Sequence, residues 1–327
     1  GYARALQVDA GGRVRRVSIT VVKPGLLSMI QSRPRAGLRH QGVPSGGAAD
    51  ALSLALANKL VGNAWDAPAI EAALLGPTLR VDADCTIAVT GAVATVTLNG
   101  TAIRQHRSVL AREGDELAVG ACETGARVYV AVAGGFAVPE VLGSAATSLQ
   151  AGFGGHEGRA LAAGDRLETV GGEASERETP AEFRPPMAAS WALRACDAAE
   201  TPLLENARTL FETNWVVDRR ADRMGLRLEG PALSVSSDGR MPSAAVFPGT
   251  VQCPEDGAPY VLSVDAGTVG GYPRVAQVAR LDRNVLGQLR PGDHVRLLRR
   301  DADDAVEELR AKIDYWREWL PAIAEIL

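Results

Sequence analysis

The amino-acid sequence predicts a mainly β protein with a few helices. Short runs rich in β-branched residues recur along the chain, as in Val17–Lys23, Thr78–Gly91 and Arg127–Gly135, and Gly, Asp or Asn separates them about every 8–12 residues. A weak internal repeat also relates Leu74–Val81 (LLGPTLRV) to Leu228–Val235 (LEGPALSV). The spacing favours a β-sandwich or β-barrel over βαβ units, and the repeat leaves open whether two related barrels follow one another.

The elements follow in order from local patterns. Residues Val17–Gly25 form a strand that ends in a Pro-Gly turn, and Ala48–Gly62 suit a helix with Asp50 near its N-terminus. The Pro-, Glu- and Gly-rich stretch Gly171–Ser190 is typical of a linker or long loop. In the last 27 residues, acidic residues load the first turn of a predicted helix, which suits the helix dipole. Apolar residues recur there at helical spacing, so one face is expected to pack on the body.

These patterns predict five consecutive parts. They are an N-terminal extension (1–16), a first β domain with a Gly-rich loop and helix (17–172), a linker (173–190), a second β domain (191–300) and a C-terminal helix (301–327). The extension has charges but no apolar core of the kind found in signal peptides. No apolar run reaches the ~18 residues that span a bilayer, so we expect a cytoplasmic protein without membrane contact.

Composition excludes several classes of function. The net charge is −4, from 35 Lys and Arg against 39 Asp and Glu, so no general attraction to nucleic acid or anionic membranes is expected. The four cysteines are far apart and none forms a CxxC pair, which favours reduced thiols over a disulfide framework. The four histidines are also scattered, so no metal site is predicted.

The segment Gln31–Asp50 (QSRPRAGLRHQGVPSGGAAD) is the first with a composition that suggests chemistry. Its glycines, which include Gly46 and Gly47, either turn the chain into the following helix or offer backbone N–H groups to a carboxylate or phosphate. Arg35, Arg39 and His40 stand just upstream. Arginine binds such anions through two parallel hydrogen bonds, and a histidine can act as a general base.

The segment Asp265–Pro273 (DAGTVGGYP) has a similar ambiguity. Three glycines surround Thr268, and Tyr272-Pro273 fixes the exit. Such a loop forms either an anion-binding nest of N–H groups or a tight β-turn beside a bulge. The segment matches neither GxGxxG nor GxxxxGK[ST], so it predicts neither a Rossmann nor a P-loop site.

Glu71 lies in an apolar run and therefore needs water or a partner for its carboxylate. Arg223 and Arg227, in DRMGLRL, are the partners considered from the second half of the chain. The sequence has no GxSxG and no evident Ser-His-Asp or Cys-His arrangement, so it does not predict a self-contained hydrolase.

Together these segments resemble the biotin-dependent carboxyltransferase family also called allophanate hydrolase subunit 2. The family includes the C-type subunit of the prokaryotic ATP-dependent 5-oxoprolinase, the antagonist of the sporulation-kinase inhibitor, and a region of urea carboxylase. The matching N-terminal residues are Lys23, Pro24, Gly25, Gln31, Arg35, Gly37, Gly42, Val43, Pro44, Gly47, Ala48 and Asp50, followed by Ala57-Asn58, Gly62-Asn63, Glu71 and Gly76-Pro77. Ala131–Thr147, DRMGLRLEG and GYP match later in the chain.

The chain departs from the family pattern at four positions. Ser32, Pro34, Gly46 and Gly267 stand where the pattern has Asp, Gly, Ser and Gln. The replacement of an acid and an amide removes polar groups that could hold a substrate.

The resemblance implies two tandem cyclophilin-like β-barrel domains and a site at domain or subunit junctions. It implies catalytic roles for Arg35, His40, Asp50 and Glu71. The substrate-binding residues that we infer are Gln31, Arg39, Gly46, Gly47, Asn58, Arg223, Thr268, Gly270, Gly271 and Tyr272. Arg35, Arg39 and the Gly-rich N–H groups would stabilise developing negative charge.

The resemblance also implies a function and partners. The first hypothesis is a component of an ATP-dependent hydrolase that opens an amide or lactam, most simply the C-type subunit of 5-oxoprolinase, active only in a complex. Its partners would be a protein like allophanate hydrolase subunit 1, which corresponds to the B-type subunit of 5-oxoprolinase, and a protein like the A-type subunit of that enzyme. One alternative is carboxyl transfer from carboxybiotin; the chain has no AMKM biotin-acceptor motif, so biotin would arrive on a partner chain. The other alternative is a regulatory protein that binds and antagonises its partner.

Overall fold

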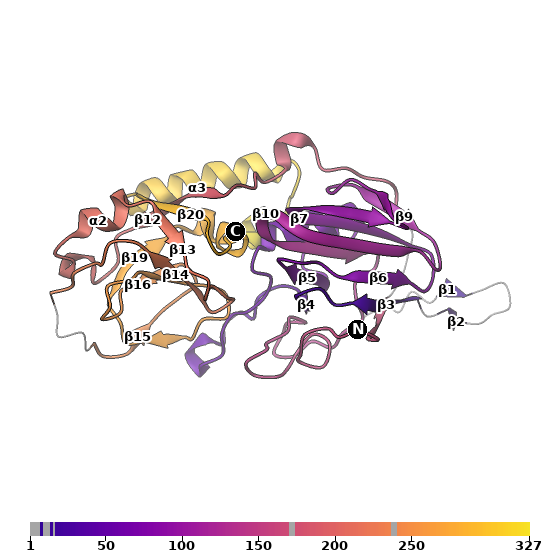
Figure 1. Ribbon diagram of the computed structural model, residues 1–327, viewed down its shortest axis with the longest axis horizontal. Coiled ribbons are helices and arrows are strands. Elements are labelled where there is room, and N and C mark those ends of the chain that lie inside the picture. Colours follow the sequence, from indigo (N-terminus) through magenta and orange to yellow (C-terminus); the bar gives the residue numbers. More distant parts are fainter. Residues whose placement is uncertain (1–6, 9–13, 16, 170–173, 237–240) are drawn as a thin grey trace. The chain divides into compact units, whose positions relative to one another are not determined.

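The computed structural model describes residues 7–8, 14–15, 17–169, 174–236 and 241–327 (Figure 1). The fold is mainly β, as predicted, with 36% of the described residues in strands and 18% in helices. The predicted extension, residues 1–16, lies largely outside the described residues, apart from the short paired strands β1 (Gln7–Val8) and β2 (Val14–Arg15). The predicted linker, residues 173–190, is described from residue 174 onward. None of the described helices is long and apolar enough to cross a membrane.

The chain divides into two compact units. The first comprises residues 1–34, 51–187 and 326, and the second comprises residues 35–50, 188–325 and 327. The Gly-rich segment 35–50 therefore belongs to the second unit, whereas the sequence prediction places it in the first domain.

The first unit is built on a nine-stranded sheet that curls into a half-barrel. Six strands lie in the order β11-β3-β6-β10-β5-β4, and β7 pairs with β10, β8 and β9. The strands are β3 (Val17–Lys23), β4 (Leu27–Gln31), β5 (Ala69–Ala73), β6 (Thr78–Val81), β7 (Cys85–Leu98), β8 (Thr101–Ala102), β9 (Ser108–Ala111), β10 (Glu116–Val132) and β11 (Arg166–Thr169). Helix α1 (Ala51–Leu60) packs on β7 and β10.

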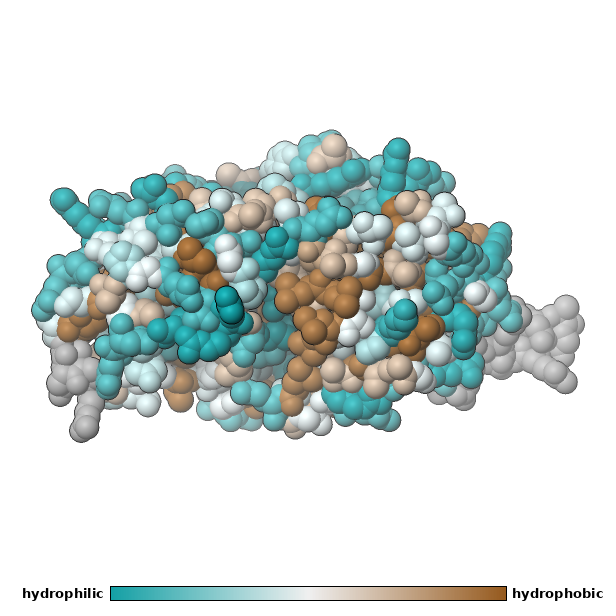
Figure 2. Space-filling model, in the orientation of Figure 1, coloured by the Kyte–Doolittle hydropathy of each residue, from teal (hydrophilic) through white to brown (hydrophobic). Residues whose placement is uncertain are grey.

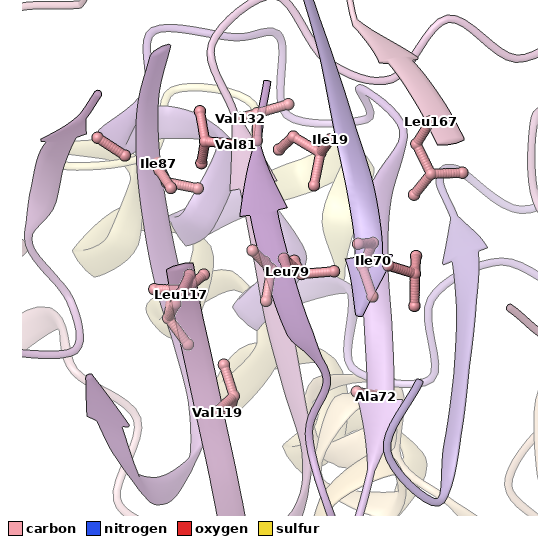
Figure 3. Packing of buried hydrophobic residues seen from close by; sticks show 14 of the residues in the cluster. Ile19, Ile70, Ala72, Leu79, Val81, Ile87, Leu117, Val119, Val132 and Leu167 are labelled. Carbon is pink, nitrogen blue, oxygen red and sulfur yellow. The ribbon is translucent and has the colours of Figure 1, made fainter. Parts of the chain in front are cut away.

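The concave face of this sheet holds the core of the first unit. Figure 3 shows Ile19, Ile70, Leu79, Ile87 and Leu117 from five different strands converging in one cluster. Side chains alternate between the two faces of a strand, so the β-branched runs in the sequence present every second residue to this core. Each of these side chains is almost completely buried, a change worth roughly 1.5–3 kcal/mol per residue.

The second unit contains a closed barrel of seven strands in the order β12-β19-β16-β17-β14-β13-β20. They are β12 (Ser190–Cys196), β13 (Trp215–Val217), β14 (Gly225–Glu229), β16 (Thr250–Gln252), β17 (Tyr260–Leu262), β19 (Arg274–Val278) and β20 (His294–Arg299). A separate two-stranded ribbon joins β15 (Ala244–Ala245) to β18 (Val269–Gly270). The barrel interior is apolar and includes the fully buried Trp215, whose Nε1 donates to the carbonyl oxygen of Leu210 at 2.9 Å.

Short helices complete the two units. They are η1 (Arg39–Gln41), η2 (Ala181–Phe183), η3 (Thr201–Leu203), α2 (Ala207–Glu212), η4 (Arg280–Gln288), α3 (Ala302–Arg317) and α4 (Ile323–Ile326). The C-terminal helix predicted over 301–327 is confirmed only in part, because α3 ends at Arg317 and the separate helix α4 follows it. The apolar pattern of α3 is only partly buried, because Trp316 is 7% exposed but Val306 is 44% exposed.

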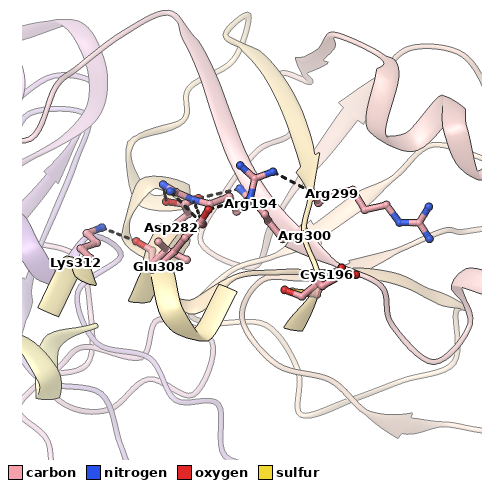
Figure 4. Close-up of polar contacts among 9 residues, drawn as sticks. Arg194, Cys196, Asp282, Arg299, Arg300, Glu308 and Lys312 are labelled. Carbon is pink, nitrogen blue, oxygen red and sulfur yellow. Dashed lines mark hydrogen bonds and ion pairs between the residues drawn. The ribbon is translucent and has the colours of Figure 1, made fainter. Parts of the chain in front are cut away.

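Polar contacts attach α3 to the barrel and to η4 (Figure 4). Arg194, on β12, donates from Nε and Nη2 to the two carboxylate oxygens of Asp282 at 2.9 and 3.0 Å. Arg300 donates to Glu308 of α3 at 3.0 Å, and Lys312 donates to the carbonyl oxygen of Leu281. Because Asp282 and Leu281 both belong to η4, these contacts fix the position of η4.

Candidate functional site

The Gly-rich segment 35–50 lies against one end of the barrel in the second unit. The N–H of Gly46 donates to the carbonyl oxygen of Val264, which follows β17, at 3.0 Å. Arg223, which precedes β14, donates from Nη2 to the carbonyl oxygen of Gly47 at 2.7 Å. Strands β14 and β17 are antiparallel neighbours, so the start of one and the end of the other meet at the same edge. Two segments far apart in sequence therefore converge there.

The carboxylate of Asp265 lies beside the arginine side chains Arg223 and Arg35 at this edge. Arg223 reaches its carboxylate from Nε at 2.7 Å and from Nη2 at 3.1 Å. Arg35 is only 2% exposed, and its burial lowers its pKa while the charge of Asp265 raises it. A Cβ at Gly46 would lie 3.1 Å from Nη1 of Arg35 and 3.6 Å from Oδ1 of Asp265. The absence of a side chain at Gly46, with φ +58°, thus lets both charged groups approach the backbone.

Arg39 joins η1 to the β15–β18 ribbon. Its Nη2 donates to the carbonyl oxygens of Val246 at 2.5 Å and Gly267 at 3.1 Å. Its guanidinium carbon lies 5.4 Å from the ring centroid of Phe247, which is a cation–π contact. Burial lowers the pKa of Arg39, and its Nε is buried without a hydrogen-bond partner among the described residues.

This arginine cluster (Arg35, Arg39, Arg223 and Asp265) has three guanidinium groups and one carboxylate. A partly buried cation is attracted to an anion more strongly than an exposed one, because water screens the charge less. Guanidinium groups match the geometry of a carboxylate or phosphate. The cluster can therefore bind an anionic group or stabilise negative charge that develops in a reaction.

Asp50 and η4 support the far end of the Gly-rich segment. Asp50 is completely buried and accepts a hydrogen bond from Nε2 of Gln288 at 2.8 Å. A Cβ at Gly287 would lie only 2.4 Å from the carbonyl carbon of Ala49. The backbone of η4 thus packs directly on the backbone of the segment, and Gln288 fixes the carboxylate that precedes α1.

Comparison with known proteins then shows the family. Residues 41–299 match the family described as "Carboxyltransferase domain, subdomain A and B". The chain belongs to this carboxyltransferase family. It is 32% identical over 302 residues to the C-type subunit of 5-oxoprolinase from Escherichia coli K12, an alignment that covers 92% of this chain and 97% of that protein. It is 33% identical to the Haemophilus influenzae protein of the same name, over 87% of this chain and 95% of that one.

Larger proteins of this family share the same fold. The chain is 33% identical to urea amidolyase of Lachancea kluyveri, over 88% of this chain but only 18% of that protein. The crystal structure of Kluyveromyces lactis urea carboxylase superposes with a TM-score of 0.84 and 28% identity, over 90% of this chain and 28% of that chain. The chain thus spans nearly the whole of the 5-oxoprolinase relatives and a minor part of the urea enzymes.

Two expectations about the Gly-rich segment need correction. The N–H of Gly46 was expected to be available to an anion, but it is used by the carbonyl oxygen of Val264. Helix α1 begins at Ala51 rather than Ala48, after a turn at residues 49–50. Gly46 and Gly47, with φ +58° and +85°, lie outside the helical region and precede that turn. In this carboxyltransferase domain the hydrogen-bond donors considered for an anion are therefore the arginine side chains and not the N–H of Gly46.

The segment Asp265–Pro273 begins in a tight turn, in which the N–H of Ala266 donates to the carbonyl oxygen of Ser263 at 3.2 Å, and continues into the short strand β18. Gly270 belongs to β18, and Thr268 accepts a hydrogen bond from Val246 through its backbone oxygen. Gly270 and Gly271 have no left-handed φ. A Cβ at Gly270 would lie 2.5 Å from Nε2 of Gln252, so a side chain there would displace that amide. Tyr272 is 47% exposed.

Two of the remaining predicted residues make contacts outside the arginine cluster. His40 is exposed on η1 and contacts Gln41 at 3.3 Å. Asn58, in the first unit, donates to the carbonyl oxygens of Trp65 and Ala67 and accepts from Asn63, which favours a structural role. The catalytic and binding roles predicted for these residues stay predictions.

Glu71 and Gln31 are buried in the first unit. Glu71 accepts a hydrogen bond from the hydroxyl of Tyr129 at 2.8 Å and lies 3.4 Å from Nε of Arg127. Arg223 and Arg227, considered from the sequence as possible partners of Glu71, form ion pairs with Asp265 and Asp256 in the second unit. The amide of Gln31 donates to the carbonyl oxygen of Thr147 at 3.1 Å, while its Oε1 has no hydrogen-bond partner within the described part of the chain.

Three contributors to the site are not predicted by the sequence: Phe247, Gly287 and Gln288. Their sequence surroundings carry no signal, since a Phe before a Pro-Gly turn or a Gly-Gln pair is common. Only the tertiary packing shows that Phe247 lies under Arg39 and that Gln288 reaches Asp50. Within the described residues no group of His, Cys, Asp and Glu side chains could hold a metal ion.

Proposed function

We propose that this chain is one component of an ATP-dependent complex that opens a lactam or amide, with 5-oxoproline as its substrate. The observation that carries the proposal is the likeness to the C-type subunit of 5-oxoprolinase over 97% of that protein's length. The partners in this proposal are a protein like allophanate hydrolase subunit 1, which corresponds to the B-type subunit of 5-oxoprolinase, and a protein like its A-type subunit.

The geometry of the arginine cluster is consistent with this chemistry. 5-Oxoproline carries a carboxylate, and opening its lactam develops negative charge on the carbonyl oxygen. Arg39 carries a partly buried positive charge, and Arg35 lies beside Asp265 in the same cluster, so both can attract the anionic group. Donors held in a partly dehydrated site stabilise such charge without reorganisation, and the loss of one costs about 10²–10³ in rate.

ATP would supply the phosphoryl group that activates the amide. The chain contains no GxxxxGK[ST] segment, so we assign no residue here to the nucleotide and place its recognition in the complex. The three arginines suit the anionic substrate or a phosphorylated form of it. Biotin plays no part in this first proposal.

The test is ATP turnover by the reconstituted complex with either 5-oxoproline or urea. Stimulation by 5-oxoproline, with glutamate as product, is the expected result. Arg39→Ala should lower that turnover by about 10²-fold, while Arg317→Ala, an exposed arginine on α3, serves as the control. Full turnover by the Arg39→Ala complex would refute the proposal that the arginine cluster binds the substrate.

A second candidate is carboxyl transfer to urea or a related amide from carboxybiotin on another chain. The superposition on urea carboxylase with a TM-score of 0.84 favours it. Stimulation by urea, dependent on a biotinylated partner, would select this alternative. Tight binding to the partner without turnover on either compound would instead favour the regulatory alternative.

A further inference from the structure

Arg39 is the arginine of the cluster that keeps its charge without a carboxylate. Asp265 accepts two hydrogen bonds from Arg223, and its charge raises the pKa of Arg35. Burial alone lowers the pKa of Arg39, and within the described residues no carboxylate forms an ion pair with it. Arg35 and Arg223 are buried, whereas Arg39 is partly exposed. An incoming anion would therefore meet the uncompensated charge of Arg39 first.

Neutral groups hold the guanidinium of Arg39. Its Nη2 donates to the carbonyl oxygens of Val246 at 2.5 Å and Gly267 at 3.1 Å, and its Nη1 donates to the hydroxyl oxygen of Ser45 at 3.3 Å. The guanidinium carbon lies over the ring of Phe247, 5.4 Å from its centroid. Because none of these groups is charged, they fix the position of the cation and leave its net charge in place.

The contact with Arg39 distinguishes Phe247 from other exposed apolar residues. Figure 2 shows apolar side chains in patches on a largely hydrophilic face, so exposure alone is not evidence of a role. Phe247 is 50% exposed, and the guanidinium of Arg39 covers its ring. The face of an aromatic ring attracts a cation through its quadrupole, and this attraction increases when the pair is partly removed from water.

The backbone at Phe247 is fixed by contacts that the ring does not make. The N–H of Phe247 donates to the hydroxyl oxygen of Thr250 at 3.0 Å. The preceding Val246 is buried and packs with Leu262 and Ala266 in a small apolar cluster. Truncation of the ring should therefore leave the backbone in place, so its effect on the site can be measured separately from folding.

A ring suits this position better than a carboxylate would. A carboxylate in contact with Arg39 would neutralise the guanidinium and repel an anionic ligand. An aromatic ring orients the guanidinium through its face and takes no N–H group as a hydrogen-bond acceptor would. The donors of Arg39 that are not used by the protein thus stay available to the ligand.

We propose that Phe247 is a positioning residue of the site, whose ring holds the guanidinium of Arg39 in the orientation that meets the anionic group of the substrate. The inference rests on the proposed function, in which an anionic amide or lactam binds at the arginine cluster. It assigns the direct contact to Arg39. Arg35 and Arg223, which lie beside Asp265, act on the ligand through their charge.

The first experiment measures kcat/KM for 5-oxoproline from ADP release by the reconstituted complex. Phe247→Ala removes the ring, Phe247→Leu restores apolar bulk without a ring, and Phe247→Tyr restores the ring. Each is made alone, and Phe247→Ala is also combined with Arg39→Ala. Tyr315→Ala is the matched control, because it removes an aromatic residue of similar exposure, 51%, on α3.

We expect Phe247→Ala and Phe247→Leu to lower kcat/KM about fivefold, the effect of losing one partly exposed cation–π contact. Phe247→Tyr and Tyr315→Ala should keep the wild-type value. In the Arg39→Ala background, Phe247→Ala should cause no further loss, because the ring acts only through that arginine.

The second experiment does not depend on turnover. Phenylglyoxal, which modifies arginine side chains, is added to the whole chain, and the rate at Arg39 is measured by peptide mass spectrometry. The exposed Arg317 on α3 is the internal reference. Phe247→Ala and Phe247→Leu should raise the relative rate at Arg39 about fivefold, because the guanidinium is no longer held, and Phe247→Tyr should not change it.

Several results would overturn the inference. They are an unchanged kcat/KM in Phe247→Ala, full recovery in Phe247→Leu, a further loss in the double variant, or equal modification rates in all variants. If Phe247→Ala does not fold, the comparison of Phe247→Leu with Phe247→Tyr decides. If 5-oxoproline does not stimulate ATP turnover, the proposed function falls, and the modification rates still decide whether the ring positions Arg39.

Discussion

Gly287→Ala should displace the Gly-rich segment and thereby lower activity. The new Cβ would lie 2.4 Å from the carbonyl carbon and oxygen of Ala49 and 2.7 Å from the amide nitrogen of Asp50. Ordinary contacts begin near 3.4 Å, so the two backbones must separate by about 1 Å. Neither side of this contact is a flexible side chain, and the shift must therefore pass into the segment that carries Arg35 and Arg39.

The expected magnitudes follow from this displacement. Overpacking costs about 1–3 kcal/mol in the free energy of unfolding. The shift also lengthens the hydrogen bond from Gln288 to the buried Asp50, and a bond to a charged group contributes about 1.5–3 kcal/mol. A 1 Å misplacement of positioning groups costs about 10²-fold in rate. We therefore expect a measurable loss of stability together with a fall in kcat/KM of that order.

The assay combines urea unfolding of the chain with kcat/KM of the reconstituted complex. Gly120→Ala is the control, since Gly120 lies on β10 in the first unit without a left-handed φ, and a Cβ there would lie 3.2 Å from the oxygen of Thr95. It should leave kcat/KM unchanged. Gln288→Ala tests the same support without adding bulk and should also lower kcat/KM. Wild-type stability and kcat/KM in Gly287→Ala would refute the reasoning.

Three further predictions concern stability. Burial lowers the pKa of His106 to about 4 from 6.5, so the unfolded state binds more protons between these values. The free energy of unfolding should therefore fall by up to about 3 kcal/mol as pH drops from 6.5 towards 4. His106→Asn, which tolerates the φ of +60°, should flatten that dependence in urea titrations at several pH values. Asp282→Asn should cost about 3–5 kcal/mol, because Asp282 is buried and binds Arg194 with both oxygens. Glu308→Gln, at a half-exposed pair, should cost no more than about 1 kcal/mol, and equal losses by denaturant unfolding would contradict this contrast. Tyr129→Phe should cost about 1–3 kcal/mol by the same measurement, since it removes the hydroxyl donor of buried Glu71, and no loss would mean that Arg127 suffices.

The sequence was sufficient for the parts that depend on local pattern. Alternating β-branched runs predicted the strands, and acidic residues before a 3.6-residue apolar pattern predicted α3. The cations at Arg35 and Arg39 beside a Gly-rich segment predicted where charge would gather. Each of these signals lies within a short window, where periodicity and turn chemistry act directly.

The hydrogen-bond partner of a buried side chain such as Glu71 could not be predicted from the sequence, because it depends on strand register and on how distant segments fold together. Glu71 meets Tyr129 because β5 and β10 pair these two residues directly. A shift of one residue in that register would turn Tyr129 to the other face. Nothing in the local sequence distinguishes Tyr129 from the other donors that could hold a buried carboxylate.

The glycines of the site show the same limit most clearly. By composition, Gly46, Gly267, Gly270 and Gly287 are equivalent, and each could be needed for a turn. The structure separates them by cause: backbone angle at Gly46, side-chain packing at Gly270 and backbone packing at Gly287. Gly267 has none of these causes: it has no left-handed φ, and a Cβ there would meet only the carbonyl oxygen of Val269 at 3.6 Å. Backbone angle and tertiary packing thus decide which glycine the fold requires, and composition carries information on neither.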